Sequence, residues 1–394
     1  MTYNFDEIVN RKNTNCEKWD NCTDRFGKND LLPLWVADMD FKTPDFVINA
    51  LKQRLEHEIL GYQIRPGSFY RATANWLQQR GWQIDPQKIC FSPGVVPAIN
   101  FAVLVFSNPG DKILINTPVY HPFMNAVNNH ERELVKSSLV NSGDGYYTVD
   151  FDDFERKLAE GVKMYIMCSP HNPVGRVWTL DELKKIGELC LKYNVLIVSD
   201  EIHSDLVFEP NRHIYFASIS EEFANQAVTF IAPSKTFNVA GLSSSVVYSD
   251  NPVLIGKFRK YLNRLSISAG TIFGDIALEA AYTHGGEWLS QLLEYLEANC
   301  QYVVDYLAKH IPQIKTRKPE GTYLMWLDCS ALNMTSEQIH DFMVSEAGIA
   351  VNPGRIFGDE GELFVRLNIA TQRAILEQAL DNLRNAVEQI KSSN

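Results

Sequence analysis

Short apolar runs alternate with helix-like segments through the middle of the chain. Most of these runs are continuously apolar, which is typical of strands buried on both faces of a parallel sheet. They lie at Lys112–Asn116, Lys163–Cys168, Val195–Ser199, Ala227–Ala232 and Ser245–Ser249, with a weaker one at Lys88–Phe91. Between them, Thr179 and Glu182 have the spacing of a capping box and predict a helix over Leu180–Tyr193. Residues from about 50 to 280 are therefore predicted to form one α/β domain.

The pattern changes after residue 284. The later segments are a long amphipathic helix at Glu287–Ile311, strands at Thr322–Leu327 and Leu363–Ile369, a helix after Thr335, and a terminal helix at Arg373–Ile390. This order predicts a second, smaller α+β domain. We expect a large domain over residues 49–284, a small domain over 285–394, and an N-terminal segment, 1–48, that joins the small domain.

Composition narrows the class of protein. The 394 residues carry a formal net charge of −11, which argues against nucleic acid or an anionic membrane as the main partner. No apolar run reaches the roughly 18 residues of a membrane span, and the N-terminus has no secretory signal pattern. The seven cysteines are dispersed and include no C-x-x-C pair. Reduced thiols and a cytoplasmic location are expected.

Polar residues at the ends of three predicted strands suggest a ligand site, because the carboxyl ends of parallel strands form one crevice. Asp200 ends a buried run, where a carboxylate needs a partner that compensates its charge. That partner is the N-terminus of a helix that Asp200 caps, a basic side chain in a salt bridge, or a protonated ring nitrogen. Lys235 follows another buried run and is either a surface lysine or an amine nucleophile that forms a Schiff base. Asn172 lies in a turn between Pro170 and Pro173, as a plain turn residue or as a donor to a phenolate oxygen.

A fourth feature is the segment Ser92–Ile99, SPGVVPAI, which joins a strand to a helix. The backbone N–H groups of Gly94, Val95 and Val96 could meet an anion at the helix N-terminus. The segment matches neither the dinucleotide fingerprint nor the P-loop.

Taken together, the motifs resemble the fold type I enzymes that depend on pyridoxal 5′-phosphate (PLP), the aspartate aminotransferase superfamily. The resemblance rests on HNP-x-G at 171–175, SDEIH at 199–203, SKTFN-x-AGL at 234–242 and R-x-N at 366–368. The segments PLWVADMDF at 33–41 and GVVPAI at 94–99 are similar to the MalY/PatB group of cystathionine β-lyases and related C–S lyases. This resemblance implies an α/β fold with a mostly parallel sheet between helices in the large domain and a smaller α+β domain.

The resemblance also implies roles for individual residues. Lys235 would hold PLP as an internal aldimine and move the substrate Cα proton, while Asp200 would bind the pyridine nitrogen. The remaining cofactor contacts would be Asn172 at O3′, Tyr120 on the ring face, His203 beside the ring, Ser234, Val95 and Val96 at the phosphate, and Tyr62 reaching the phosphate of a neighbouring subunit. The amino-acid substrate would be held by Arg366 at its α-carboxylate, with Ala37, Asn172 and Tyr62 nearby. A homodimer with shared active sites follows from the role of Tyr62.

Three departures from the aminotransferase pattern are informative. His203 replaces the usual tyrosine, and Ser243 replaces an arginine that commonly binds phosphate. Asp38 and Asp40 lie in a segment without basic residues, which disfavours a dicarboxylate substrate unless an arginine arrives from elsewhere. The implied reaction is α,β-elimination from L-cystathionine or cysteine S-conjugates to thiol, pyruvate and ammonia. An aminotransferase, which shares the same carbanion, and a non-catalytic regulatory protein on this fold remain alternatives.

Overall fold

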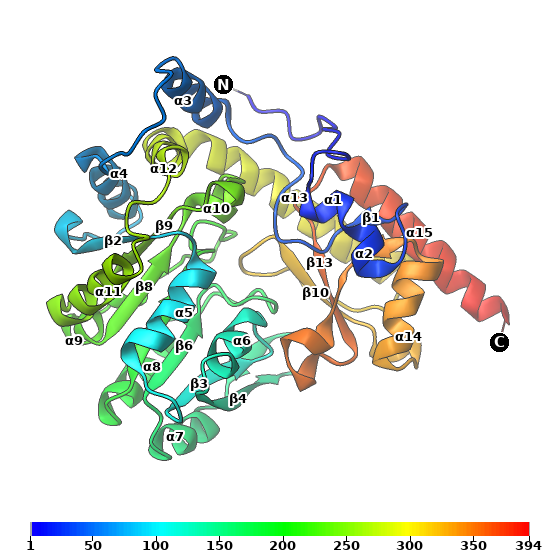
Figure 1. The fold of residues 1–394 in the computed structure, drawn as a ribbon. Coiled ribbons are helices and arrows are strands. Elements are labelled where there is room, and N and C mark those ends of the chain that lie inside the picture. Colours follow the sequence, from blue (N-terminus) through cyan, green and yellow to red (C-terminus); the bar gives the residue numbers. More distant parts are fainter. Residues whose placement is uncertain (1, 394) are drawn as a thin grey trace.

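A computed structural model describes residues 2–393. The larger part of the molecule is built around an eight-stranded mixed sheet, which lies apart from the C-terminal helices α13 (Gly286–His310) and α15 (Arg373–Ser393) in Figure 1. The strands lie in the order β2-β9-β8-β7-β6-β3-β4-β5. Their bounds are β2 Ile89–Ser92, β3 Lys112–Thr117, β4 Glu133–Asn141, β5 Tyr147–Val149, β6 Met164–Cys168, β7 Leu196–Asp200, β8 Ala227–Ile231 and β9 Ser245–Tyr248. The five strands from β8 to β4 pair in parallel, which confirms the predicted parallel centre.

The edges of this sheet differ from the prediction. Strand β9 runs antiparallel to both β8 and β2, although all of its residues are buried. A continuous apolar run reports burial on both faces but not the direction of the strand, so the sequence pattern could not distinguish the two. Strands β4 and β5 were not predicted, because β4 is a half-exposed strand near the sheet edge and lacks a long apolar run.

Helices cover both faces of the sheet because successive strand residues point to opposite sides. Ile113 and Ile115 pack with one group of helices, whereas Leu114 packs with the other. The first group is α5 Val95–Phe106, α6 Pro122–Asn128 and α11 Pro252–Arg264. The second is α4 Gly67–Gln78, α7 Phe151–Ala159, α8 Leu180–Lys192 and α12 Ile272–His284. Helix α8 begins with the expected capping box of Thr179 and Glu182.

The C-terminal region forms a second sheet in the order β10-β13-β12, entirely antiparallel. Its strands are β10 Leu324–Asp328, β12 Asn352–Pro353 and β13 Phe364–Asn368, and its helices are α13 Gly286–His310, α14 Ser336–Asp341 and α15 Arg373–Ser393. The N-terminal segment lies against this region, since β1 Leu32–Pro33 pairs with β11 Ile349–Ala350. The remaining α-helices are α1 Glu17–Asp20, α2 Cys22–Phe26, α3 Asp45–Leu55, α9 Glu221–Asn225 and α10 Pro233–Thr236. Within residues 2–393, no helix has the length and apolarity needed to cross a bilayer.

Candidate active site

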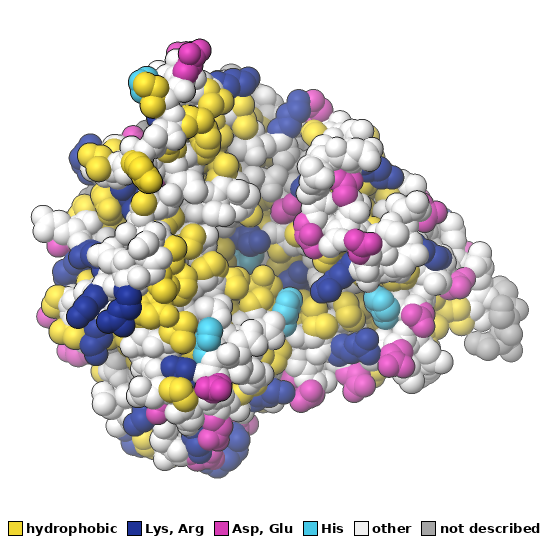
Figure 2. Space-filling model, viewed as in Figure 1, with side chains coloured by type: hydrophobic (Ala, Val, Ile, Leu, Met, Phe, Trp, Pro, Cys, Tyr) yellow, Lys and Arg dark blue, Asp and Glu magenta, His cyan; other side chains and the backbone are white. Residues whose placement is uncertain are grey.

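A cavity opens at the carboxyl ends of the central parallel strands, where the C-terminal region faces the large sheet. Figure 2 shows a hollow between these two parts with basic side chains in it. Nine of the predicted site residues line the cavity: Ala37, Val95, Val96, Tyr120, Asn172, Asp200, His203, Ser234 and Lys235. Arg366 adjoins it, because its Nη1 donates to Asn172 Oδ1 at 3.1 Å. Tyr62 does not line the cavity; its side chain is fully exposed elsewhere on the surface.

Four strand ends place the polar groups. Asp200 is the last residue of β7, and Lys235 lies in α10, directly after β8. Asn172 follows β6 and Tyr120 follows β3. The Tyr120 backbone N–H donates to the Asn172 carbonyl at 3.1 Å, which ties these two loops together. Because neighbouring parallel strands end at one edge, residues far apart in sequence converge on one crevice.

Asp200 is a buried carboxylate that has no cationic hydrogen-bond partner among the residues that the structure describes. Burial raises its pKa to about 7, although the Ile202 N–H and the charge of Lys235 oppose the rise. Its Oδ1 accepts the Ile202 N–H at 3.1 Å. A cation placed beside this carboxylate would restore its ionised form. The protonated nitrogen of a pyridine ring meets that need.

Lys235 is a half-buried amine that points toward the N-terminal segment. Its Nζ donates to the Ala37 carbonyl at 2.6 Å. Desolvation lowers its pKa to about 8, against the attraction of Asp38 and Asp200. A sizeable neutral fraction near neutral pH makes this amine a nucleophile and a proton acceptor.

Arg366 is a buried cation whose hydrogen-bond partners are all neutral. Its Nη2 donates to the Trp35 carbonyl at 2.9 Å and to Asn352 Oδ1 at 2.7 Å. Its Nε is buried and has no hydrogen-bond partner within the described part of the chain. Burial lowers its pKa to about 10, so it stays charged at neutral pH. A buried guanidinium without a carboxylate is a strong candidate to receive an anionic group of a ligand.

Donor groups suited to a phosphate gather at the start of α5. Gly94 has a φ of +144°, a conformation that favours glycine, and turns the chain into the helix. The N–H groups of the first helical turn have no partner within the helix. Ser244 also lines the cavity, and no described residue forms a hydrogen bond with its buried Oγ. Ser244 was not predicted, unlike Ser234, because nothing in the run of three serines at 243–245 shows which one is enclosed.

His203 presents a buried nitrogen, Nδ1, to which none of the described residues forms a hydrogen bond. Burial, and then the charges of Lys235 and Arg366, lower its pKa to about 3, so the ring is neutral. Tyr323, which the sequence analysis also missed, donates from its hydroxyl to the Ala37 carbonyl at 2.9 Å. The unpartnered atoms of His203, Ser244 and Arg366 around one cavity fit a polar cofactor and an anionic substrate.

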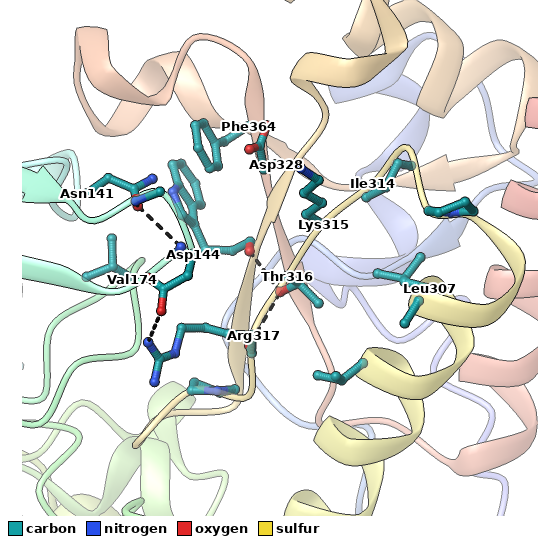
Figure 3. Close-up of a pocket in the computed structure, with 17 residues that line it drawn as sticks. Asn141, Asp144, Val174, Leu307, Ile314, Lys315, Thr316, Arg317, Asp328 and Phe364 are labelled. Carbon is teal, nitrogen blue, oxygen red and sulfur yellow. Dashed lines mark hydrogen bonds and ion pairs between the residues drawn. The ribbon is translucent and has the colours of Figure 1, made fainter.

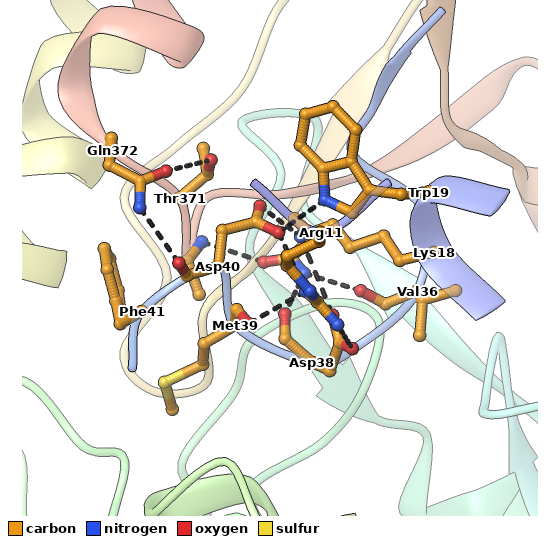
Figure 4. Close-up of polar contacts among 12 residues, drawn as sticks. Arg11, Lys18, Trp19, Val36, Asp38, Met39, Asp40, Phe41, Thr371 and Gln372 are labelled. Atoms are coloured by element: carbon orange, nitrogen blue, oxygen red, sulfur yellow. Dashed lines mark hydrogen bonds and ion pairs between the residues drawn. The ribbon is translucent and has the colours of Figure 1, made fainter. Parts of the chain in front are cut away.

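The acidic segment after Ala37 is neutralised within the protein (Figure 4). Both carboxylate oxygens of Asp38 bind Arg11, at 3.1 and 2.6 Å. Asp40 binds Arg11 at 2.8 Å, the fully buried Lys18 at 2.7 Å and Trp19 at 2.8 Å. The basic partners arrive from residues 11 and 18, so the acidity of this segment no longer bears on the charge of the substrate.

Fold and site together define a member of a known family. The model for aminotransferase class I and II matches residues 29–383, and the chain belongs to this family. It is 41% identical to cystathionine beta-lyase PatB of Bacillus subtilis, over 98% of this chain and 100% of PatB. It is 33% identical to protein MalY of Escherichia coli, over 99% of this chain and 100% of MalY. The crystal structure of cystalysin from Treponema denticola, which contains PLP, matches with a TM-score of 0.95 at 39% identity, covering 99% of this chain and 100% of cystalysin. The resemblance to the MalY/PatB group is confirmed.

Proposed function

We propose that the protein is a PLP-dependent C–S β-lyase that converts L-cystathionine and related cysteine S-conjugates to a thiol, pyruvate and ammonia. The observation that carries the proposal is the buried, anion-free Arg366 beside the Asp200 and Lys235 cavity. The choice of C–S bond cleavage as the reaction is supported by the 41% identity to a cystathionine beta-lyase along 98% of this chain.

The cavity residues divide between cofactor and substrate. Asp200 would hold the ring nitrogen, Asn172 and His203 the ring substituents, and Tyr120 the ring face. The phosphate would meet the N–H groups of Val95 and Val96 and the hydroxyls of Ser234 and Ser244. Bound in this way, PLP supplies an electron-withdrawing ring that stabilises negative charge on the substrate Cα.

The chain itself then has three tasks. Arg366 binds the α-carboxylate and so fixes the direction in which the Cα–H bond points. The neutral Lys235 amine accepts the Cα proton. Loss of this proton lets the bond from Cβ to sulfur break, with the thiolate as leaving group, and water completes the conversion to pyruvate and ammonia.

We further propose that two copies share their active sites. Tyr62 is exposed together with Ile59 and Ile64, at 111%, 67% and 90%. Three large side chains so exposed on one short segment are typical of a surface that another subunit covers. Tyr62 of one copy would then reach the phosphate site of its partner.

Two further expectations belong to this proposal. The N-terminal segment 1–48 and residues 285–394 form the smaller domain, which the pairing of β1 with β11 supports. The enzyme works in the cytoplasm, which the unpaired cysteines support, because six of the seven are buried free thiols.

The test is pyruvate release from L-cystathionine by the purified protein with no keto acid added. We expect sustained pyruvate formation by the native enzyme and a loss of at least about 1,000-fold in Lys235→Ala. An aminotransferase would instead need a keto acid for continued turnover, and a regulatory protein would form no pyruvate. Full activity of Lys235→Ala would refute the role of this amine.

A further inference from the structure

A second cavity lies between the β4–β5 hairpin and the segment that connects α13 with β10 (Figure 3). It shares no lining residue with the first cavity. Its volume of about 300 Å³ falls at the lower end of the range for small-molecule sites. One wall belongs to the large sheet and the other to the C-terminal region. A molecule bound here would therefore contact both parts of the protein.

The inner wall of this cavity is apolar. Leu307 and Ile314 come from α13 and the segment after it, and Val174 comes from the loop after β6. Trp326 and Phe364 add two stacked rings, with centroids 5.1 Å apart and planes inclined by 8°. Flat aromatic and branched aliphatic side chains provide a surface for an apolar ligand body.

Two cations lie at the rim. Arg317 is already paired with Asp144 at 3.7 Å. The exposed Lys315 forms no ion pair with any of residues 2–390, whose side chains the structure describes. The nearby Asp328 is engaged at one oxygen by the Ser330 N–H, at 2.8 Å. Lys315 is therefore the group best able to bind a carboxylate on a ligand whose body rests on the apolar wall.

We propose that this cavity binds a small apolar carboxylate and that its occupancy changes the affinity of the Arg366 site for substrate. The effect on substrate affinity rests on the proposed function. Two short routes connect the sites. The Trp326 ring lies 5.5 Å from that of Phe357, whose centroid is 4.9 Å from the Arg366 guanidinium. Trp326 also pairs directly with Arg366 between β10 and β13.

The other route runs through the loop after β6. Val174 lines the second cavity, and Asn172, two residues earlier, lines the first. Asn172 Oδ1 accepts a hydrogen bond from Arg366. A ligand that shifts Trp326 or Val174 would thus move the Arg366 guanidinium, either through Phe357 or through Asn172. The resulting change in substrate affinity would appear in KM.

Binding is tested by calorimetry on the holoenzyme with phenylacetate and its uncharged counterpart phenylacetamide. We expect phenylacetate to bind at least fivefold more weakly to Lys315→Gln than to the native enzyme, because the variant lacks the ammonium. Lys309→Gln, a matched change of an exposed lysine outside the cavity, should bind phenylacetate normally. Phenylacetamide should not distinguish the three proteins.

Equal phenylacetate binding to the native enzyme and Lys315→Gln would overturn the site. Coupling is tested by the KM for L-cystathionine, which phenylacetate should change at least twofold in the native enzyme but not in Lys315→Gln. Binding that depends on Lys315 while KM stays constant would overturn the coupling. Because calorimetry needs no turnover, failure of the lyase proposal would leave the binding result intact.

Discussion

At the scale of single residues, the charge of Asp200 has a measurable cost. Its pKa rises on folding from 3.8 to about 7. The folded cofactor-free protein therefore binds more protons than the unfolded chain between these values, and its stability falls as pH increases through them. The full penalty, reached above about pH 7, is on the order of 4 kcal/mol.

Asp200→Asn should remove this dependence. We expect the cofactor-free variant to exceed the native protein in unfolding free energy, with a gap that widens from pH 4 to pH 7 in urea titrations. Asp359→Asn, at an exposed position, serves as the control. With PLP bound, the protonated ring nitrogen would pair with the native Asp200 carboxylate. The difference in unfolding free energy between the variant and the native protein should then disappear. A gap that is independent of pH would contradict the raised pKa.

Arg366 makes the second residue-level prediction. In Arg366→Lys, a single ammonium replaces the fork of donors, so the α-carboxylate loses its bidentate partner. We expect kcat/KM for L-cystathionine to fall about 100-fold, mostly through KM. Steady-state kinetics measure this, with Arg355→Lys at the surface as the matched control. An unchanged KM would remove Arg366 from substrate binding.

The sequence located several of these residues and missed others for a physical reason. Asp200 ends a buried strand and Asn172 and Lys235 follow two others, so topology alone brings them together. Tyr323 and Ser244 enter the site only through the packing of segments distant in sequence. No local pattern encodes that packing, and an enclosed serine looks like an exposed one in the sequence.

At the scale of elements, buried ion pairs tie together the N-terminal segment that carries Ala37. Lys18 is fully buried and pairs with the buried Asp40 at 2.7 Å. In Lys18→Met, Asp40 loses one of its two cationic partners, so we expect a loss of about 3 kcal/mol in the free energy of unfolding. Chemical denaturation measures this loss, and Lys12→Met at an exposed position should show almost none.

The elements themselves were predicted unevenly. The capping box of α8 and the buried strands at the sheet centre have strong local signals, and both were confirmed. The direction of β9 and the existence of β5 depend on which neighbours they pair with. Pairing partners are set by the whole fold, so a pattern read along one segment does not contain them.

At the scale of the whole molecule, shared active sites predict that two inactive variants complement each other. In a mixed dimer of Lys235→Ala and Tyr62→Ala, one site carries both defects and the other carries neither. Equal mixing of the two variants after unfolding and refolding should restore about a quarter of native pyruvate formation, since about half of the dimers are mixed. No activity beyond the sum of the two separate variants would place Tyr62 outside its partner's site.

The burial of six of the seven cysteines bears on the proposed reaction, because that reaction releases a thiol. A C–S lyase produces free thiols, and oxygen converts these thiols to disulfides. Burial raises the pKa of Cys90 to about 11, and it raises those of Cys168, Cys190, Cys300 and Cys329 further. Protonated and enclosed sulfur atoms exchange poorly with disulfides. These five thiols are thereby protected from forming mixed disulfides with the product of the proposed reaction.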